Sequence, residues 1–179
     1  MTRYSFFIYC SIFSIVFVLA SSFLCEDIRP LNLRIKNGEF KVDKLMVSAD
    51  WKITPLKSKL GNPQKTIKGV NTTYTYTDLG LVLFEGVDST INEIQIYYNI
   101  QNSTKVSPYS VFRGDLKIDK LMVENNLTKE LMFETLLNWN PGPSYTAHLY
   151  RAQKEGIYLY FEFEADEKSL VKVIIGRVN

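Results

Sequence analysis

One eleven-residue segment occurs twice in the chain. Residues 37–47 read NGEFKVDKLMV and residues 113–123 read RGDLKIDKLMV, with seven identical positions and an offset of 76 residues. An ungapped match of this density indicates a tandem duplication, and a fixed internal period decides the architecture. We therefore expect two similar units, residues 31–100 and residues 111–179, separated by a connector rich in Asn, Ser and Thr.

The N-terminal residues have the pattern of an export segment. Arg3 precedes an apolar run without charge that extends to Cys25. Small residues near position 22 suit a signal peptidase, so residues 1–22 are expected to be a signal peptide and the protein to be periplasmic or secreted. One alternative is a membrane anchor over residues 5–25, because about 20 apolar residues span a hydrocarbon core. Lipid modification of Cys25 is a further alternative.

Composition excludes several classes of protein. Cys10 lies in the export segment and Cys25 at its edge, so the folded part is expected to lack disulfides and thiolate metal sites. Removal of Arg3 with that segment leaves 20 basic and 19 acidic residues, interspersed along the chain. A net charge near +1 gives no electrostatic reason to bind nucleic acid. We expect no cofactor, and membrane contact only through the N-terminal segment if it is retained.

The first unit begins with a predicted hairpin and a short helix. Residues 31–35 alternate as in a half-buried strand, and Asn37-Gly38 is typical of a hairpin turn that leads to an inward Phe40 and Val42. Over residues 54–61, Thr54 is the expected N-cap, Pro55 the first helical residue and Gly61 the end. Leu56 and Leu60, four residues apart, form the stripe that packs on a sheet.

Strands follow the helix in both units. Apolar alternation predicts an antiparallel meander over residues 71–98. In the second unit, residues 114–123 are expected to be the opening strand, followed by a helix over residues 128–139 that begins at Thr128. Further strands are predicted at residues 145–150, 157–164 and 170–175, the last covered on both faces. The fold class is α+β, a tandem repeat of two small units, each with one helix packed on an antiparallel sheet.

Three motifs of the first unit resemble a known family. They are Thr54-Pro55 followed by Leu60-Gly61-x-Pro63, the run from Tyr74 to Leu81, and Ile94-x-Ile96. These motifs resemble an uncharacterised family of exported bacterial domains, a domain of unknown function. More distantly, they are similar to the small envelope domains of the beta-lactamase inhibitor protein and the outer-membrane assembly lipoprotein. The resemblance covers most of residues 38–99 and, more weakly, residues 114–176. It implies an exported repeat domain and does not establish function.

Few residues suggest chemistry. His148, the single histidine, is interpreted as a satisfied strand residue, and Asp43-Lys44 and Asp119-Lys120 as turns or surface ion pairs. Glu162 and Glu164 lie two apart and therefore on one strand face, the arrangement that could suggest glycoside chemistry. We expect no cleft over them and predict that the protein is not an enzyme.

An aromatic strand face is the most specific functional feature. Residues 157–164 alternate an apolar set, expected in the core, with an outward set of Tyr158, Tyr160, Glu162 and Glu164; the equivalent positions of the first unit are Val82 and Phe84. Tyr and Phe on a rigid sheet are typical of protein interfaces, although the same face could be buried between the two units. We predict a non-enzymatic exported protein-binding module, an inhibitor or immunity-type protein of the bacterial envelope. The alternatives are an envelope assembly factor and, more remotely, a hydrolase that uses Glu162 and Glu164.

Overall fold

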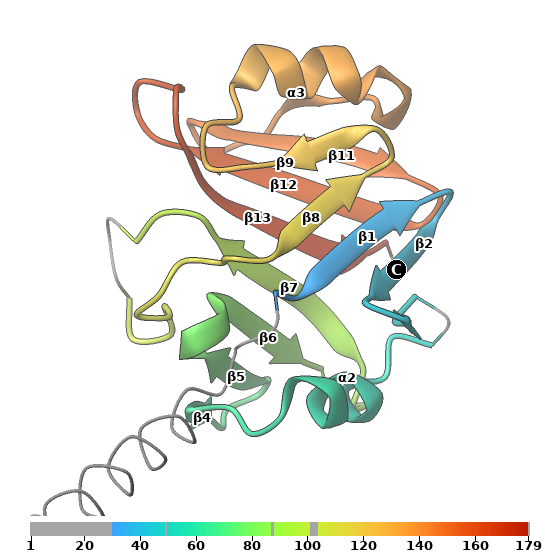
Figure 1. Ribbon diagram of the computed structural model, residues 1–179, viewed down its shortest axis with the longest axis vertical. Coiled ribbons are helices and arrows are strands. Elements are labelled where there is room, and N and C mark those ends of the chain that lie inside the picture. The colour runs from blue at the N-terminus through green and yellow to red at the C-terminus, as the bar shows by residue number, and fades with distance from the viewer. Residues whose placement is uncertain (1–29, 49, 87, 101–103, 179) are drawn as a thin grey trace, which may run out of the picture.

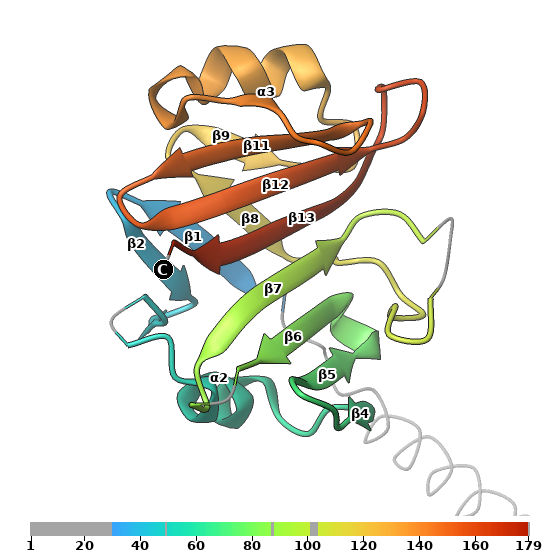
Figure 2. The same ribbon diagram turned by 180° about the vertical axis from the view of Figure 1, so that it is seen from behind.

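The fold consists of two face-to-face sheets and two helices. The computed structural model describes residues 30–48, 50–86, 88–100 and 104–178. A five-stranded mixed sheet covers one face of an eight-stranded antiparallel sheet, and helices α2 and α3 lie at opposite ends of the smaller sheet (Figures 1 and 2). This confirms the α+β class. The predicted signal peptide or anchor lies outside the described residues, and no helix within them is long and apolar enough to cross a membrane.

The smaller sheet places the first strand between two hairpins. Its strands are β1 (Asn32–Lys36), β2 (Glu39–Val42), β3 (Leu45–Met46), β8 (Asp115–Ile118) and β9 (Leu121–Val123), in the order β3-β2-β1-β8-β9. β1 is antiparallel to β2 and parallel to β8, with Leu33 beside Leu116 and Ile35 beside Ile118. These side chains are buried against the larger sheet, as are Phe40 and Val42, which confirms their predicted inward direction.

The repeated segments form the β2–β3 and β8–β9 hairpins. Their turns contain Asp43 and Asp119, which adopt positive φ values of 52° and 51°, a conformation that Asp tolerates better than most residues. The single opening strand expected over residues 114–123 was wrong for this reason, because the chain reverses at Asp119. The interpretation of both Asp-Lys pairs as turns is confirmed.

The larger sheet joins strands from both halves of the chain. Its strands are β4 (Lys65–Ile67), β5 (Thr72–Tyr76), β6 (Leu81–Glu85), β7 (Ile91–Tyr97), β10 (Gly142–Pro143), β11 (Leu149–Lys154), β12 (Ile157–Phe163) and β13 (Leu170–Arg177), in the order β10-β11-β12-β13-β7-β6-β5-β4. The β5–β6–β7 meander is confirmed. The strand expected over residues 145–150 begins only at Leu149, because His148 lies in a turn with a φ of 60°.

Both helices are short and are placed by apolar contacts. α2 (Ile53–Leu60) buries Ile53 and Leu56 and ends at Gly61. Its N-cap is Lys52 and not Thr54, because Lys52 is the last residue with extended backbone angles. α3 (Lys129–Thr135) continues into the 3₁₀ turn η2 (Leu137–Trp139), and the Thr128 hydroxyl accepts a hydrogen bond from the backbone N–H of Leu131, as predicted. A second 3₁₀ turn, η1 (Thr77–Leu79), connects β5 to β6.

The core lies between the sheets and leaves the other face of the larger sheet partly open. On β12 the predicted apolar set is buried: Ile157, Leu159, Phe161 and Phe163. On β13, Val173 and Ile175 point into the same core, whereas Lys172 and Ile174 point away from it and are half-buried. The expectation that this last strand is covered on both faces was therefore wrong, because no described element forms a second layer behind it. The partly open side of the eight-stranded sheet is called the outer face below.

Candidate functional site

Strand register brings most of the predicted site residues onto the outer face. Tyr158 is paired with Gly176, Gly176 with Glu93 and Glu93 with Phe84, so one row crosses β12, β13, β7 and β6. The adjacent row contains Tyr160, Ile174, Gln95 and Val82 in the same strand order. Glu162 shares the face next to Lys172, and Glu164 lies just beyond the end of β12. The β13–β7 pairing joins the two halves edge to edge, so the outer face is not buried between them (Figure 2).

The two tyrosines form an ordered pair at the centre of the outer face. Their rings pack edge to face with centroids 5.5 Å apart. A Cβ atom on Gly176 would lie 2.2 Å from the Cζ atom of Tyr158, so the tyrosine ring occupies the space above this glycine. The Tyr158 hydroxyl donates to the carbonyl of Asn92 at 3.4 Å. Burial, together with the nearby Glu93 and Tyr160, raises the pKa of the Tyr158 phenol to about 12.

In the first half of the chain, the predicted surface is partly covered. Val82 is completely buried, while Phe84 is half-buried. Thr75, the cross-strand neighbour of Val82, donates from its hydroxyl to the carbonyl of Val106 at 3.0 Å, so the segment 104–108 lies over this part of the sheet. The expectation that Val82 contributes to an exposed surface was wrong, because Val82 is fully buried and the segment 104–108 lies over this part of the sheet.

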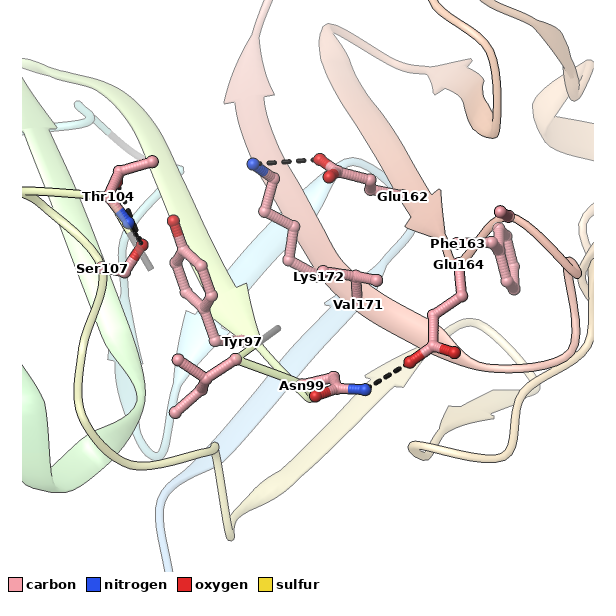
Figure 3. A pocket seen from close by; sticks show the side chains of 11 residues that line it. Tyr97, Asn99, Thr104, Ser107, Glu162, Phe163, Glu164, Val171 and Lys172 are labelled. Atoms are coloured by element: carbon pink, nitrogen blue, oxygen red, sulfur yellow. Dashed lines mark hydrogen bonds and ion pairs between the residues drawn. The ribbon is translucent and has the colours of Figure 1, made fainter. Parts of the chain in front are cut away.

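A pocket opens where the outer face meets this connector. It has a volume of ≈390 Å³, and its lining comes from the ends of β7 and β12, from β13 and from the connector: Tyr97, Asn99, Ile100, Thr104, Ser107, Glu162, Phe163, Glu164, Ala165, Val171 and Lys172. Figure 3 shows the ring of Tyr97 between the connector and Lys172. Thr104 and Ser107 bond to each other on the connector side through hydroxyls 3.0 Å apart. The lining thus combines aromatic, aliphatic and hydrogen-bonding groups.

The two glutamates predicted on this face line the pocket. Glu162 is in an ion pair with Lys172 at 3.0 Å, and Asn99 donates to Glu164 (Figure 3). Lys172 also lies 5.7 Å from the ring centroid of Tyr97. The expectation that no cleft covers these carboxylates was wrong, because the connector adds a wall that a single strand pattern does not reveal. Each carboxylate is already engaged by a neighbouring side chain.

His148 belongs to a separate polar cluster. Its Nδ1 atom lies 3.5 Å from Oε1 of Glu167, and Glu167 also accepts hydrogen bonds from Lys129 and Tyr150. The bonds from Lys129 and then Tyr150 lower the pKa of the Glu167 carboxyl from 4.5 to about 2. This cluster ties the turn before β13 to the start of α3. In the described part of the chain, no three His, Cys, Asp or Glu side chains are placed to hold a metal ion.

Several residues that shape the outer face were missed from the sequence. Tyr97, Asn99 and Lys172 complete the pocket, but nothing in their local pattern distinguishes them from ordinary strand residues. Gly176 is different, because a glycine within an apolar strand signals a close approach of another group. That signal was present in the run VKVIIGR and could have placed an aromatic ring above it.

Comparisons with known proteins place the chain in a family. No curated protein sequence matches it. A DUF4309 family protein (YjgB) from Bacillus subtilis aligns with a TM-score of 0.47 and 16% identity, over 79% of this chain and 88% of that one. A cysteine-rich secretory protein (SAV1118) from Staphylococcus aureus aligns with a TM-score of 0.40 and 15% identity, over 84% of this chain and 51% of that one. The family model of the domain of unknown function DUF7738 matches residues 32–131, more than half of the chain, and the protein therefore belongs to that family.

Proposed function

We propose that this protein is an exported, non-enzymatic module that binds another protein through the outer face of its eight-stranded sheet. The observation that carries the proposal is the Tyr158–Tyr160 pair, which stands half-buried on a rigid sheet beside the ≈390 Å³ pocket. Tyrosine offers a large apolar contact and a polar tip at little cost in conformational entropy, which is why it is enriched at binding surfaces.

The arrangement around the tyrosines supports a protein ligand. Ile174 lies beside Tyr160 on β13, and Phe84 lies on β6 across β7; both are apolar and half-buried. Glu162 is paired with Lys172 and Glu164 accepts a hydrogen bond from Asn99, so a partner meets carboxylates that are already engaged. A partner that lays an apolar side chain against Tyr160 and inserts a polar side chain toward Tyr97 would match both parts of the site.

We also propose a tandem duplication and a role in the bacterial envelope. We infer a tandem duplication, supported by the 76-residue offset and by the sheet order, in which β10–β13 and β7–β4 run outward from a central β13–β7 pair. An inhibitor or immunity-type protein of the bacterial envelope is favoured, given the export pattern of residues 1–22 and the motif resemblance to the beta-lactamase inhibitor protein. An envelope assembly factor is the alternative.

Capture of the partner by matched variants tests the proposal. Wild type, Tyr160→Ala and Tyr145→Ala would each be immobilised and exposed to the exported proteins of the host. Tyr145 is fully solvent-exposed and lies outside the sheet, so it is the control for loss of a tyrosine. We expect Tyr145→Ala to retain a single partner that Tyr160→Ala loses, with both melting temperatures near that of wild type. Equal capture by all three proteins would contradict the proposal.

The pocket keeps one enzymatic alternative open to experiment. Glu162 and Glu164 line it together, as a hydrolase with two carboxylates would require. Glu162→Gln retains the shape of the side chain and removes the charge. The binding proposal expects no turnover of glycosides by wild type; turnover that Glu162→Gln abolishes would replace that proposal with a hydrolase.

A further inference from the structure

The other sheet carries an unexplained cluster of cations. On the solvent side of the five-stranded sheet, Arg34 is paired across the strands with Lys41 on one side and Lys117 on the other. Neighbouring strands lie about 4.8 Å apart, so three cationic side chains stand in one row. Lys41 is in an ion pair with Glu39 at 2.7 Å, whereas Arg34 and Lys117 face each other and neither is in an ion pair with a described residue. Like charges directly opposite each other destabilise a sheet. The neighbouring Arg34 and Lys117 therefore repel each other, and a bound anion would stabilise them.

The row borders a cleft that adds further cations. The cleft has a volume of ≈530 Å³ and lies between this sheet, the turn after β8 and the η2 segment; its lining is Arg34, Lys36, Asn37, Lys117, Asp119, Lys120, Thr135, Leu137, Asn138 and Lys154. These residues, called the basic cleft below, include five cations and one carboxylate. Figure 1 views the solvent side of this sheet, with α3 at its upper end.

The carboxylate that lines the basic cleft already has a hydrogen bond and an ion pair within the protein. Asp119 accepts a hydrogen bond from Nε1 of the buried Trp139 at 2.8 Å and lies 3.4 Å from Nζ of Lys154. Burial alone would raise the pKa of Asp119, but these two partners outweigh it and the pKa is lowered, so the carboxylate stays charged. Among the described residues, Arg34, Lys36, Lys117 and Lys120 are in no ion pair.

We propose that the basic cleft binds a ligand that carries two or more linked phosphate groups. Four cations without partners require several negative charges within one small volume. Carboxylates would have to come from four separate side chains, whereas each phosphate group brings up to two charges and three acceptor oxygens. Arg34 supplies the planar donor pair suited to phosphate oxygens, and the lysines act as point charges around it. Asn37, Thr135 and Asn138 provide neutral hydrogen-bonding groups at the rim.

The shared chemistry has two possible sources, a soluble polyphosphate and the headgroups of an anionic membrane. The test therefore uses two probes: sodium tripolyphosphate in a calorimetric titration at low salt, and vesicles that contain cardiolipin, whose headgroup links two phosphates, compared with phosphatidylcholine vesicles in a co-sedimentation assay. The variant is Arg34→Gln/Lys36→Gln/Lys117→Gln. The control is Lys68→Gln/Lys105→Gln/Lys168→Gln, which removes the same number of charges from exposed sites elsewhere.

We expect wild type and the control to bind tripolyphosphate, and the cleft variant to lose at least about tenfold in affinity without a lower melting temperature, since three mutually repelling charges are removed. Binding to cardiolipin vesicles but not to tripolyphosphate would support the same site and assign the linked phosphates to a membrane lipid. The proposal would be overturned by binding to neither probe, by equal losses in the cleft variant and the control, or by equally tight binding of poly-glutamate of matched charge.

Discussion

Replacement of Gly176 by alanine tests the geometry of the outer face. Gly176 is not among the positive-φ residues, so alanine fits its backbone. Its Cβ atom, however, would lie 2.2 Å from both Cζ and the hydroxyl of Tyr158 and 2.6 Å from Cε1, where ordinary contact begins near 3.4 Å. The tyrosine ring has to leave its place. It then loses its edge-to-face contact with Tyr160 and its hydrogen bond to the Asn92 carbonyl.

The expected cost follows from these contacts. Overpacking of a closely fitted site costs about 1–3 kcal/mol, and an aromatic pair adds about 0.5–1.5 kcal/mol beyond area burial. We therefore expect Gly176→Ala to lower the free energy of unfolding by about 2 kcal/mol. In a chain of this size that corresponds to a fall in melting temperature of about 4–8 °C.

A double-mutant cycle separates this clash from other effects. In a Tyr158→Ala background no ring opposes the new methyl group, and alanine is favoured over glycine in a strand by about 0.5–1 kcal/mol. Gly176→Ala should then stabilise, and the coupling energy between the two positions should be about 2–3 kcal/mol. The measurement is chemical denaturation of wild type, both single variants and the double variant. Additive effects would refute the claim that Tyr158 lies over Gly176.

Two further predictions concern the anchors of the second half. Asp119→Ala should lower the free energy of unfolding by about 1–3 kcal/mol, because the indole N–H of the buried Trp139 loses its acceptor and Ala disfavours a positive φ. Asp119→Asn keeps an acceptor and tolerates that φ, so it should lower the free energy of unfolding clearly less. Equal losses of stability in thermal denaturation would contradict this explanation. Glu167→Gln should destabilise the folded protein at pH 7. The pKa of Glu167 is lowered in the folded state from 4.5 to about 2, so the contribution of this carboxylate to folding stability is complete above pH 4.5 and is lost as the pH falls toward 2. Melting curves of both proteins across that range should converge at low pH, and a constant gap would exclude the role assigned to this carboxylate.

The sequence predicted well those elements whose signal is local. Alternation on β1, β2 and β12 decided which side chains are buried, because period-two patterns fix the two faces of a strand. Asn37-Gly38 marks the predicted hairpin turn, and both residues have positive φ values. Membership of a family of unknown function was predicted from the motifs around α2 and β5 and is confirmed.

The predictions that failed concern features of the fold that depend on tertiary contacts. No local pattern indicates that β1 pairs in parallel with β8, because such pairing depends on strands about 80 residues apart. Val82 occupies the strand position that corresponds to Tyr158, so it was predicted on the same exposed face. The segment 104–108 that covers this part of the sheet is a polar loop without periodicity, so its position could not be predicted from the sequence. The basic cleft could not be predicted either, because it also depends on tertiary contacts. Its cations are interspersed along the chain, and only the sheet register and the turn after β8 bring them together.

Site-specific photocrosslinking tests whether the outer face of the eight-stranded sheet binds a protein. A photoreactive phenylalanine derivative would replace Tyr160 on the outer face or, as the control, Tyr145 outside the sheet, and the host cells would be irradiated intact. We expect one discrete protein adduct from position 160 and none from position 145. No adduct at position 160, or the same adducts from both positions, would contradict the conclusion that the outer face of the eight-stranded sheet binds a protein.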